Sequence, residues 1–189
     1  MILYLHGFAS SPQSLKARQL QARMHQRGLG RHFAAPQLPV SPAAAIALAE
    51  TLIARATAPV TLVGSSLGGH YATWLAERHD LRAVVVNPAV LAHLSLDRYL
   101  GTKTHYHSGE SFEFTRDHMA EMAALTVPAI SHPKRYWLLA EQGDEVLDYR
   151  QAVDLYRGAR QTVLAGGDHS FTRWEDYLDE VIDFAVLES

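Results

Sequence analysis

The sequence contains no cysteine. Disulfides, thiolate metal sites and cysteine nucleophiles are therefore excluded, and a reducing compartment fits this composition. The chain also lacks an excess of positive charge, because 17 Lys and Arg residues stand against 20 Asp and Glu residues, a net charge of −3. A protein that binds nucleic acid through phosphate contacts needs a basic surface, so we expect no nucleic-acid partner.

Long apolar runs are absent as well. No stretch approaches the ~20 apolar residues that a membrane helix requires, and the N-terminal run is too short for a signal peptide and has no basic lead. We expect no membrane partner and a cytoplasmic location. The composition, with 48% hydrophobic and 20% charged residues, is that of an ordinary folded protein. A chain of 189 residues predicts a single domain, 1–189, with one sizeable core.

Short β-rich apolar runs alternate with longer helical stretches, and this alternation predicts an α/β fold. The predicted strands are Ile2–Leu5, Phe33–Ala35, Val60–Val63, Ala83–Val86, Tyr136–Ala140 and Gln161–Ala165. Four of these runs are unbroken rather than alternating, which is typical of parallel strands covered by helices on both faces. We therefore expect a mostly parallel sheet with right-handed crossovers.

The predicted helices carry start signals. Two begin with a serine N-cap followed by proline, at Ser11–Pro12 and Ser41–Pro42. Two more begin at a capping-box spacing, Asp148 with Gln151 and Thr172 with Glu175.

Residues 90–133 interrupt the alternation of strands and helices, because this segment is longer than the connection between two parallel strands needs to be. Such an excursion is usually functional, and we interpret it as a lid-like insertion.

The stretch 62–70, LVGSSLGGH, follows an apolar run and precedes a predicted helix. The strand-to-helix turn that carries a nucleophilic serine has the form G-x-S-x-G. Gly64 and Gly68 match this form around Ser66, whereas the same form around Ser65 would need glycines where the chain has Val63 and Leu67. The register therefore selects Ser66. The motif alone could also be a plain turn.

A nucleophilic serine needs a histidine base, and the histidine needs a carboxylate to orient it. In hydrolases whose nucleophile lies in a G-x-S-x-G turn, the order of these residues along the chain is serine, acid, histidine. His169, in the stretch GGDHSF, is the one histidine of eleven that follows both a strand and a suitable acid. Among the acids before it we select Asp144, since it follows a glycine at the top of its loop. The alternatives are Glu141, Glu145, Asp148 and Asp168.

An oxyanion hole needs two backbone N–H donors. One is expected from Leu67, directly after the nucleophile, and the other from Phe8 in the loop HGFAS, with Ala9 as the alternative. The pair His105 and His107 could bind a metal, but no carboxylate stands at clear ligand spacing. We therefore predict neither a metal nor an organic cofactor.

Several stretches together resemble one family, namely YLHGFASSP, GSSLGGHYATWLAE, VVNPAV, GDEVLDY and GGDHSF. They are similar to the small YqiA-type esterases of the α/β-hydrolase superfamily, nearly end to end. The resemblance implies a nucleophile at Ser66, an acid at Asp144 and a base at His169. It also implies a reduced sheet of about six strands. The implied substrates are carboxylic esters, with acyl-CoA thioesters as a further class.

The predicted function is therefore a serine esterase that acts on a small-molecule ester or thioester through an acyl-enzyme intermediate. The same residues would also serve an amidase or a cofactor-free perhydrolase, because a fold does not determine the reaction. A different alternative is a non-catalytic ligand-binding module built on a hydrolase fold.

Overall fold

The computed structural model describes residues 1–90 and 99–185. They contain a six-stranded sheet in the order β2-β1-β3-β4-β7-β8, in which every neighbouring pair is parallel. Its strands are β1 Ile2–Leu5, β2 Phe33–Ala34, β3 Thr61–Ser65, β4 Arg82–Val86, β7 Tyr136–Glu141 and β8 Arg160–Leu164. The mostly parallel sheet of about six strands is therefore confirmed.

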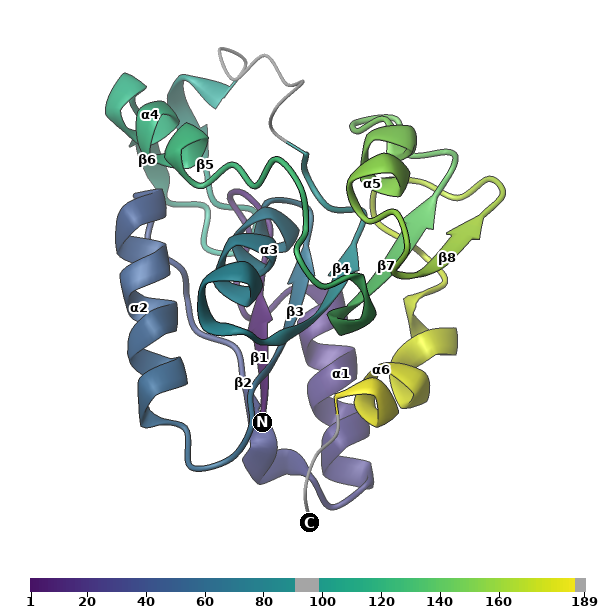
Figure 1. Cartoon of the computed structure of the whole chain (residues 1–189). Coiled ribbons are helices and arrows are strands. Elements are labelled where there is room, and N and C mark those ends of the chain that lie inside the picture. Colours follow the sequence, from purple (N-terminus) through teal and green to yellow (C-terminus); the bar gives the residue numbers. More distant parts are fainter. Residues whose placement is uncertain (91–98, 186–189) are drawn as a thin grey trace.

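Helices cover both faces of this sheet (Figure 1). The helices are α1 Leu15–Gln26, α2 Pro42–Arg55, α3 Leu67–His79, α4 Arg116–Ala124, α5 Tyr149–Leu155 and α6 Leu178–Phe184, with short 3₁₀ turns at Gly30–His32, Pro133–Arg135 and Trp174–Tyr177. Helices α2, α3 and α5 lie on one face, and α1 and α6 lie on the other. In β1, Leu3 and Leu5 pack toward the first group while Ile2 and Tyr4 pack toward the second. Burial on both faces accounts for the unbroken apolar runs.

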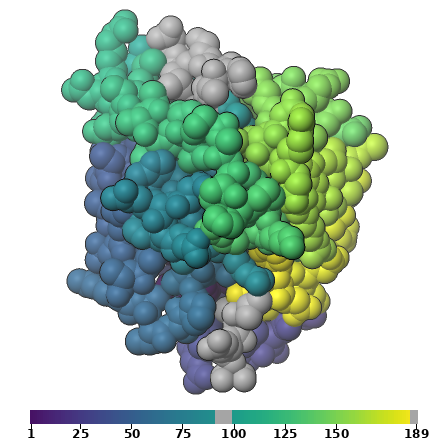
Figure 2. All heavy atoms as spheres, viewed as in Figure 1, coloured from purple at the N-terminus to yellow at the C-terminus, as the bar shows by residue number. Residues whose placement is uncertain are grey.

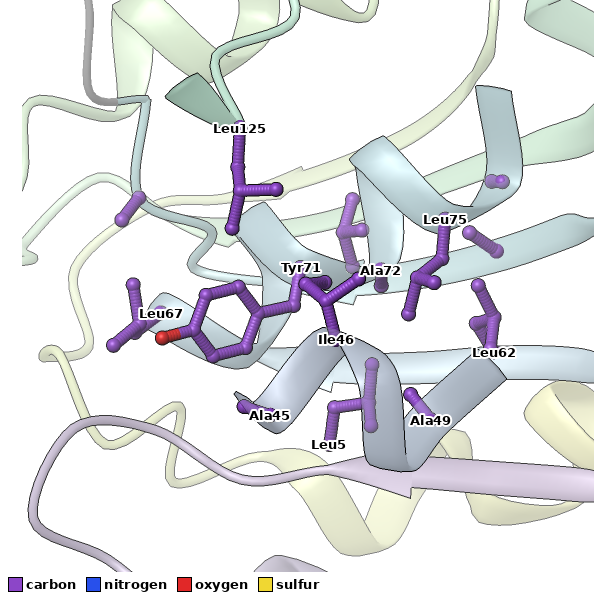
Figure 3. Close-up of a cluster of buried hydrophobic side chains, with 14 of the residues drawn as sticks. Leu5, Ala45, Ile46, Ala49, Leu62, Leu67, Tyr71, Ala72, Leu75 and Leu125 are labelled. Carbon is purple, nitrogen blue, oxygen red and sulfur yellow. The ribbon is translucent and has the colours of Figure 1, made fainter. Parts of the chain in front are cut away.

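The core beneath α2 and α3 is shown in Figure 3. Ile46 and Ala49 of α2 pack there against Leu5 and Leu62 of the sheet and against Tyr71 of α3. Ile46 and Ala49 share one helical face because residues three apart lie on the same side of a helix. This packing holds α3, and therefore the turn that precedes it, firmly against the sheet.

The excursion at 90–133 contains structure of its own. Strands β5 Gly101–Thr104 and β6 Ser111–Phe114 form an antiparallel hairpin, and α4 follows. The hairpin meets the loop after β1, since the Tyr106 N–H donates to the Ala9 carbonyl at 2.9 Å. In α4, the Glu121 carboxylate accepts a hydrogen bond from the Ser41 hydroxyl at the start of α2, at 2.6 Å.

Figure 2 shows the visible atoms of this excursion (green) above α2 and α3 (blue to teal). Residues 91–98, a part of the predicted lid, lie outside the described residues. The contacts with Ala9 and Ser41 dock the described part of the excursion on the loop after β1 and on the start of α2. Its movement as a lid stays a prediction.

The predicted start of α1 at Ser11 is wrong. The N-cap is Ser14, whose hydroxyl accepts from the Ala17 N–H at 3.4 Å. Ser11 instead closes the turn before the helix, because its carbonyl accepts from the Ser14 N–H and its hydroxyl accepts from the Gln13 N–H. Both serines are good N-caps by local chemistry, and the path of the loop after β1 decides between them. The N-cap predicted at Ser41 is confirmed.

The predicted start at Thr172 is also wrong. A 3₁₀ turn comes first, and α6 begins only at Leu178. Phe171, with φ of +52°, and Trp174 are both buried there, and the tight turn brings both rings into the core. Asp148 caps α5 with its side chain, as predicted.

In the ranges that the structure describes, no helix has the length and apolarity needed to cross a membrane.

Candidate active site

Ser66 lies in the sharp turn between β3 and α3. Its backbone has φ of +55° and ψ of −119°, a conformation that is strained for any residue with a side chain. A Cβ atom on Gly64 would lie 2.2 Å from the Gly68 carbonyl oxygen, and one on Gly68 would lie 1.9 Å from the Leu5 carbonyl oxygen. Both glycines are therefore required for β3, α3 and β1 to approach one another closely enough to form this turn.

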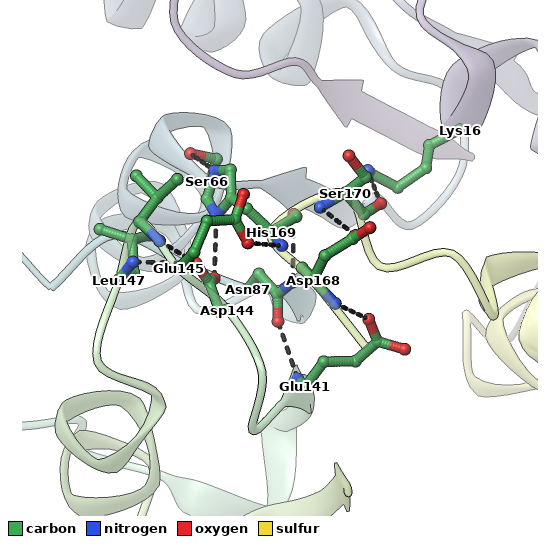
Figure 4. Close-up of polar contacts among 11 residues, drawn as sticks. Lys16, Ser66, Asn87, Glu141, Asp144, Glu145, Leu147, Asp168, His169 and Ser170 are labelled. Carbon is green, nitrogen blue, oxygen red and sulfur yellow. Dashed lines mark hydrogen bonds and ion pairs between the residues drawn. The ribbon is translucent and has the colours of Figure 1, made fainter. Parts of the chain in front are cut away.

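Three side chains from three different loops meet at this turn (Figure 4). The His169 Nε2 atom lies 3.0 Å from the Ser66 hydroxyl oxygen, and its Nδ1 atom lies 2.8 Å from Asp144 Oδ2. Ser66 follows β3, Asp144 follows β7 and His169 follows β8, so the parallel topology brings all three to the carboxyl edge of the sheet. The three residues selected from the sequence as nucleophile, acid and base thus lie in one hydrogen-bonded chain.

Both oxygens of the Asp144 carboxylate accept hydrogen bonds, one from the backbone and the other from His169. Its side chain is 2% exposed, and Oδ1 accepts the backbone N–H groups of Val146 and Leu147, each at 2.8 Å. Burial opposes ionisation, but the hydrogen bonds from His169 and from these backbone groups outweigh it and lower the pKa of Asp144 below its ordinary value. Asp144 is therefore an anion at neutral pH, oriented with one oxygen toward the imidazole.

The other acids have different partners. Glu145 accepts the backbone N–H of His169 at 3.0 Å, and Asp168 accepts the Ser170 N–H at 2.8 Å. The buried Glu141 carboxylate accepts the Asp168 N–H and pairs with Arg173, each at 2.8 to 2.9 Å. In the part of the chain that the structure describes, the imidazole of His169 bonds to no carboxylate except Asp144. The rival acids shape the loop that carries the imidazole.

Asn87 at the end of β4 is a site residue that the sequence analysis missed. It is 3% exposed, and its side-chain amide donates to the carbonyls of Asp168 and His169 at 3.0 and 3.1 Å. Its side-chain oxygen accepts the Glu141 N–H at 2.9 Å, so one amide connects β7 with the loop after β8. An asparagine directly after a buried apolar run, before Pro88, was the available signal.

Replacing Asn87 by alanine is expected to lower the free energy of unfolding by about 1–3 kcal/mol, because buried backbone groups lose their partners. Urea unfolding at constant m-value measures this change. Asn87→Asp is the informative comparison, since it keeps the acceptor for Glu141 but loses both donors to the loop. We expect it to be at least as destabilised. An unchanged midpoint in both variants would contradict the role assigned to this amide.

The loop after β1 lies directly against the nucleophile. A Cβ atom added to Gly7 would lie 3.4 Å from the Ser66 Cβ, so the space between the loop and the turn is at most wide enough for one methyl group. The buried His6 ring holds the loop, because its Nε2 accepts the Leu38 N–H at 3.1 Å and its Nδ1 lies 2.9 Å from the Gly7 carbonyl. Burial lowers the pKa of His6 to about 4, which keeps the ring neutral and able to accept from Leu38.

Phe8 and Leu67, the two predicted oxyanion donors, both line a cavity between the loop after β1 and the start of α3. Leu67 is the first residue of α3, where N–H groups have no intrahelical partner. Neither the Leu67 N–H nor the Phe8 N–H donates to a protein acceptor among residues 1–90 and 99–185. The Phe8 ring packs edge-on against Phe112 and Phe114 of the hairpin, which orients the loop. The roles of Phe8 and Leu67, and the choice between Phe8 and Ala9, stay predictions.

His105 and His107 of the excursion are not among the described residues that line the cleft with Ser66. The His105 ring packs on Phe112 with centroids 4.4 Å apart, and its buried Nδ1 has no hydrogen-bond partner in the described structure. His107 is exposed. Among the described residues, no group of three or more His, Asp or Glu side chains could hold a metal ion. The pair at His105 and His107 is therefore not part of a larger ligand set there.

Comparison with solved structures defines the fold. Alpha/beta hydrolase domain-containing protein 10 from mouse superposes with a TM-score of 0.72 at 17% identity, covering 96% of this chain and 89% of that one. A monoacylglycerol lipase from Paleococcus ferrophilus gives 0.70 at 15% identity, with coverage of 97% and 92%. Est1E from Butyrivibrio proteoclasticus with bound ferulic acid gives 0.66 at 13% identity, with coverage of 97% and 86%. The chain has the α/β-hydrolase fold.

The sequence comparison identifies the family. The chain matches the uncharacterised protein family UPF0227 over residues 1–186, and it therefore belongs to that family. This is the YqiA-like family, so the resemblance drawn from the sequence motifs is confirmed.

Proposed function

We propose that the chain is a serine hydrolase that cleaves carboxylic esters through an acyl-enzyme intermediate. The observation that carries the proposal is the hydrogen-bonded chain from the Ser66 hydroxyl through the His169 imidazole to the Asp144 carboxylate. A serine hydroxyl is a weak nucleophile until a base takes its proton, and the base needs a carboxylate that fixes its tautomer. Both requirements are met at hydrogen-bond distance.

The reaction has two halves. In the first, His169 Nε2 takes the Ser66 proton while the serine oxygen attacks the ester carbonyl carbon, which forms a tetrahedral oxyanion. The carbon–oxygen bond to the alcohol then breaks, and His169 returns the proton to the departing oxygen. In the second half, the same imidazole takes a proton from water, whose oxygen attacks the acyl group and releases the acid and Ser66. Asp144 stabilises the imidazolium at each stage.

The oxyanion is stabilised by the N–H groups of Leu67 and Phe8. The Leu67 N–H stands at the N-terminus of α3, where the helix dipole adds positive potential. Removal of one such donor typically costs about 10²–10³ in kcat. Each proton transfer and each charge in this reaction is assigned to a residue of the chain, so the proposal includes no cofactor.

Among the substrates that such a site could hydrolyse, we select carboxylic esters. The monoacylglycerol lipase among the structural neighbours is named for ester hydrolysis, which supports this choice. Acyl thioesters and amides pass through the same tetrahedral intermediate and would use the same residues. A panel of esters and thioesters of different acyl length decides between these substrates.

The first experiment is reaction with a fluorophosphonate probe, in which an activated serine oxygen displaces fluoride from phosphorus. We expect the adduct on the tryptic peptide that contains Ser66. The neighbouring Ser65 provides a matched control, because it is the last residue of β3, directly before Ser66, and is 7% exposed. Ser65→Ala should keep the adduct, and Ser66→Ala should lose it.

The location of the adduct decides the proposal. An adduct at Ser65 would make the assigned register wrong. No adduct on folded wild-type protein, in a preparation that binds a ligand without turnover, would instead indicate a binding module on a hydrolase fold. Peptide mass spectrometry separates these results, and circular dichroism verifies that each variant is folded.

A further inference from the structure

Lys16 of α1 reaches into the candidate active site from the opposite end of the sequence. Its ammonium donates to the Ser170 carbonyl at 2.5 Å, one residue beyond His169. Figure 4 shows the side chain extending from its helix toward this loop. In the described structure it has no other hydrogen-bond partner and no carboxylate within 4.0 Å, so two of its three N–H donors have no protein acceptor.

The Lys16 ammonium lies in a cleft around Ser66 whose other described lining residues are mostly uncharged. The described residues that line it are Tyr4, Gly7, Phe8, Ser10, Ser14, Lys16, Ser65, Ser66, Tyr99, Tyr106, Val146, His169 and Ser170. Among these described residues, Lys16 is the one lysine or arginine, and none is an aspartate or glutamate. Serines and tyrosines supply neutral hydroxyl groups around it. Such a lining favours an anionic group that accepts hydrogen bonds.

The positive charge of the half-buried Lys16 ammonium is not fully balanced by a nearby negative charge. Burial lowers the pKa of Lys16, and Asp168 and Glu141 oppose this effect only by longer-range attraction. An anion bound in the cleft would supply the missing counter-charge at short range, and would itself gain a charge-assisted hydrogen bond.

The position of Lys16 relative to the base identifies the part of the substrate that it meets. The departing alcohol oxygen must lie within hydrogen-bond reach of His169 Nε2 to receive its proton. Lys16 is bonded to the carbonyl of Ser170, directly after His169, so it lies beside the loop that carries the base. The acyl carbonyl is oriented instead by the loop of Phe8 and by Leu67. The leaving group, which must reach His169, is therefore the part of the substrate that we expect Lys16 to meet.

We propose that Lys16 is a specificity-determining residue that binds an anionic oxygen group, a carboxylate or a phosphate, carried close to the ester bond by the alcohol part of the substrate. The inference rests on the proposed esterase function and names the substrate class for it. Ser10 lines the same cleft and offers a further hydroxyl donor to the anion, whereas Ser14 and Ser65, which also line it, are hydrogen-bonded to Tyr4.

The test compares matched ester pairs. In the first pair, 3-acetoxybenzoate carries a carboxylate on the leaving group and 3-acetoxybenzamide carries a neutral amide. In the second pair, phenyl hydrogen adipate carries a carboxylate on the acyl group and phenyl hexanoate carries none. Release of the phenol measures kcat/KM for each ester with wild type, Lys16→Met and Lys16→Arg. The ester 3-acetoxyphenyl phosphate then distinguishes phosphate from carboxylate as the preferred anion.

Lys16→Met is expected to lower kcat/KM for 3-acetoxybenzoate by about 10- to 100-fold, mainly through KM, as expected for loss of a charged hydrogen bond. The value for 3-acetoxybenzamide should change by less than about threefold, because uncharged substrates do not use this contact. Lys16→Arg should keep the preference for the anion. Arg18→Met is the matched control, since it removes the same charge from an exposed position on the same helix. It should leave both values unchanged.

Other outcomes would overturn the inference in recognisable ways. An equal loss for both members of the first pair would mean that Lys16 only holds the His169 loop through Ser170. A loss confined to phenyl hydrogen adipate would place the anion on the acyl side. If no ester is hydrolysed above the Ser66→Ala background, the esterase proposal itself fails. Turnover with an unchanged preference in Lys16→Met overturns the Lys16 assignment alone.

Discussion

Replacing Asp144 by asparagine is expected to lower kcat for ester hydrolysis by about 10⁴-fold while leaving the fold intact. The cause is the orientation that the site imposes on the new amide. The Oδ1 position accepts two backbone N–H groups, from Val146 and Leu147, so the amide oxygen must occupy it. The amide nitrogen then faces His169 Nδ1 and donates to it. This places the imidazole proton on Nε2, where it prevents proton transfer from Ser66.

The control for this prediction is Asp168→Asn. Asp168 uses one carboxylate oxygen to accept the Ser170 N–H, and an asparagine oxygen can do the same. We expect kcat to stay within about tenfold of wild type, because the loop geometry is preserved. Steady-state kinetics with p-nitrophenyl acetate measures both variants. An Asp144→Asn enzyme of near wild-type activity, or an equal loss in Asp168→Asn, would show that the acid is wrongly assigned.

The second large effect is expected on stability. Replacing Gly68 by alanine should lower the free energy of unfolding by about 3 kcal/mol or more, as overpacking against rigid backbone does. A Cβ atom there would lie 1.9 Å from the Leu5 carbonyl oxygen, and the backbone of β1 cannot move away without breaking its pairing with β3. Since a domain of this kind is stable by only about 5–15 kcal/mol, this is a large fraction of the total.

Gly7→Ala provides the comparison for stability. Its Cβ atom would meet the Ser65 carbonyl oxygen and the Ser66 Cβ at 3.4 Å, which is ordinary van der Waals contact. We expect a change below about 1 kcal/mol, because no neighbour must move far. Thermal and urea unfolding measure both variants. Equal stabilities for Gly68→Ala and Gly7→Ala would refute the close packing of α3 on β1.

Much of the fold could be predicted because the central strands β1, β3, β4 and β7 are buried on both faces. Such strands must be apolar at every position, and a short run such as Ala83–Val86, between polar segments, fits a buried strand better than a helix. The helix starts were harder. Ser11 and Ser14 are equally good N-caps by local chemistry, and only the path of the loop after β1 selects Ser14. Thr172 was misassigned for a similar reason, since buried aromatic rings near it impose a 3₁₀ turn.

The pattern of glycines and the chain order were enough to select Ser66, Asp144 and His169 as candidates. The glycines two residues on either side of Ser66 are visible in the sequence, and the structure shows the backbone contacts that require them. The supporting residues were not predictable in this way. Asn87 and Lys16 are ordinary residues in sequence, and their importance depends on carbonyl groups more than 80 positions away along the chain.

The sequence by itself therefore determined the layers of the fold and which side chains could do the chemistry. Apolar runs and the spacing of the glycines about Ser66 are local features of the chain, so they can be recognised in the sequence alone. Only the tertiary structure decided which carboxylate faces the imidazole, which amide holds its loop and which cation enters the cleft. Those contacts join segments distant in sequence. Hydrogen-bond distances and angles then decide which of several chemically similar side chains becomes the partner.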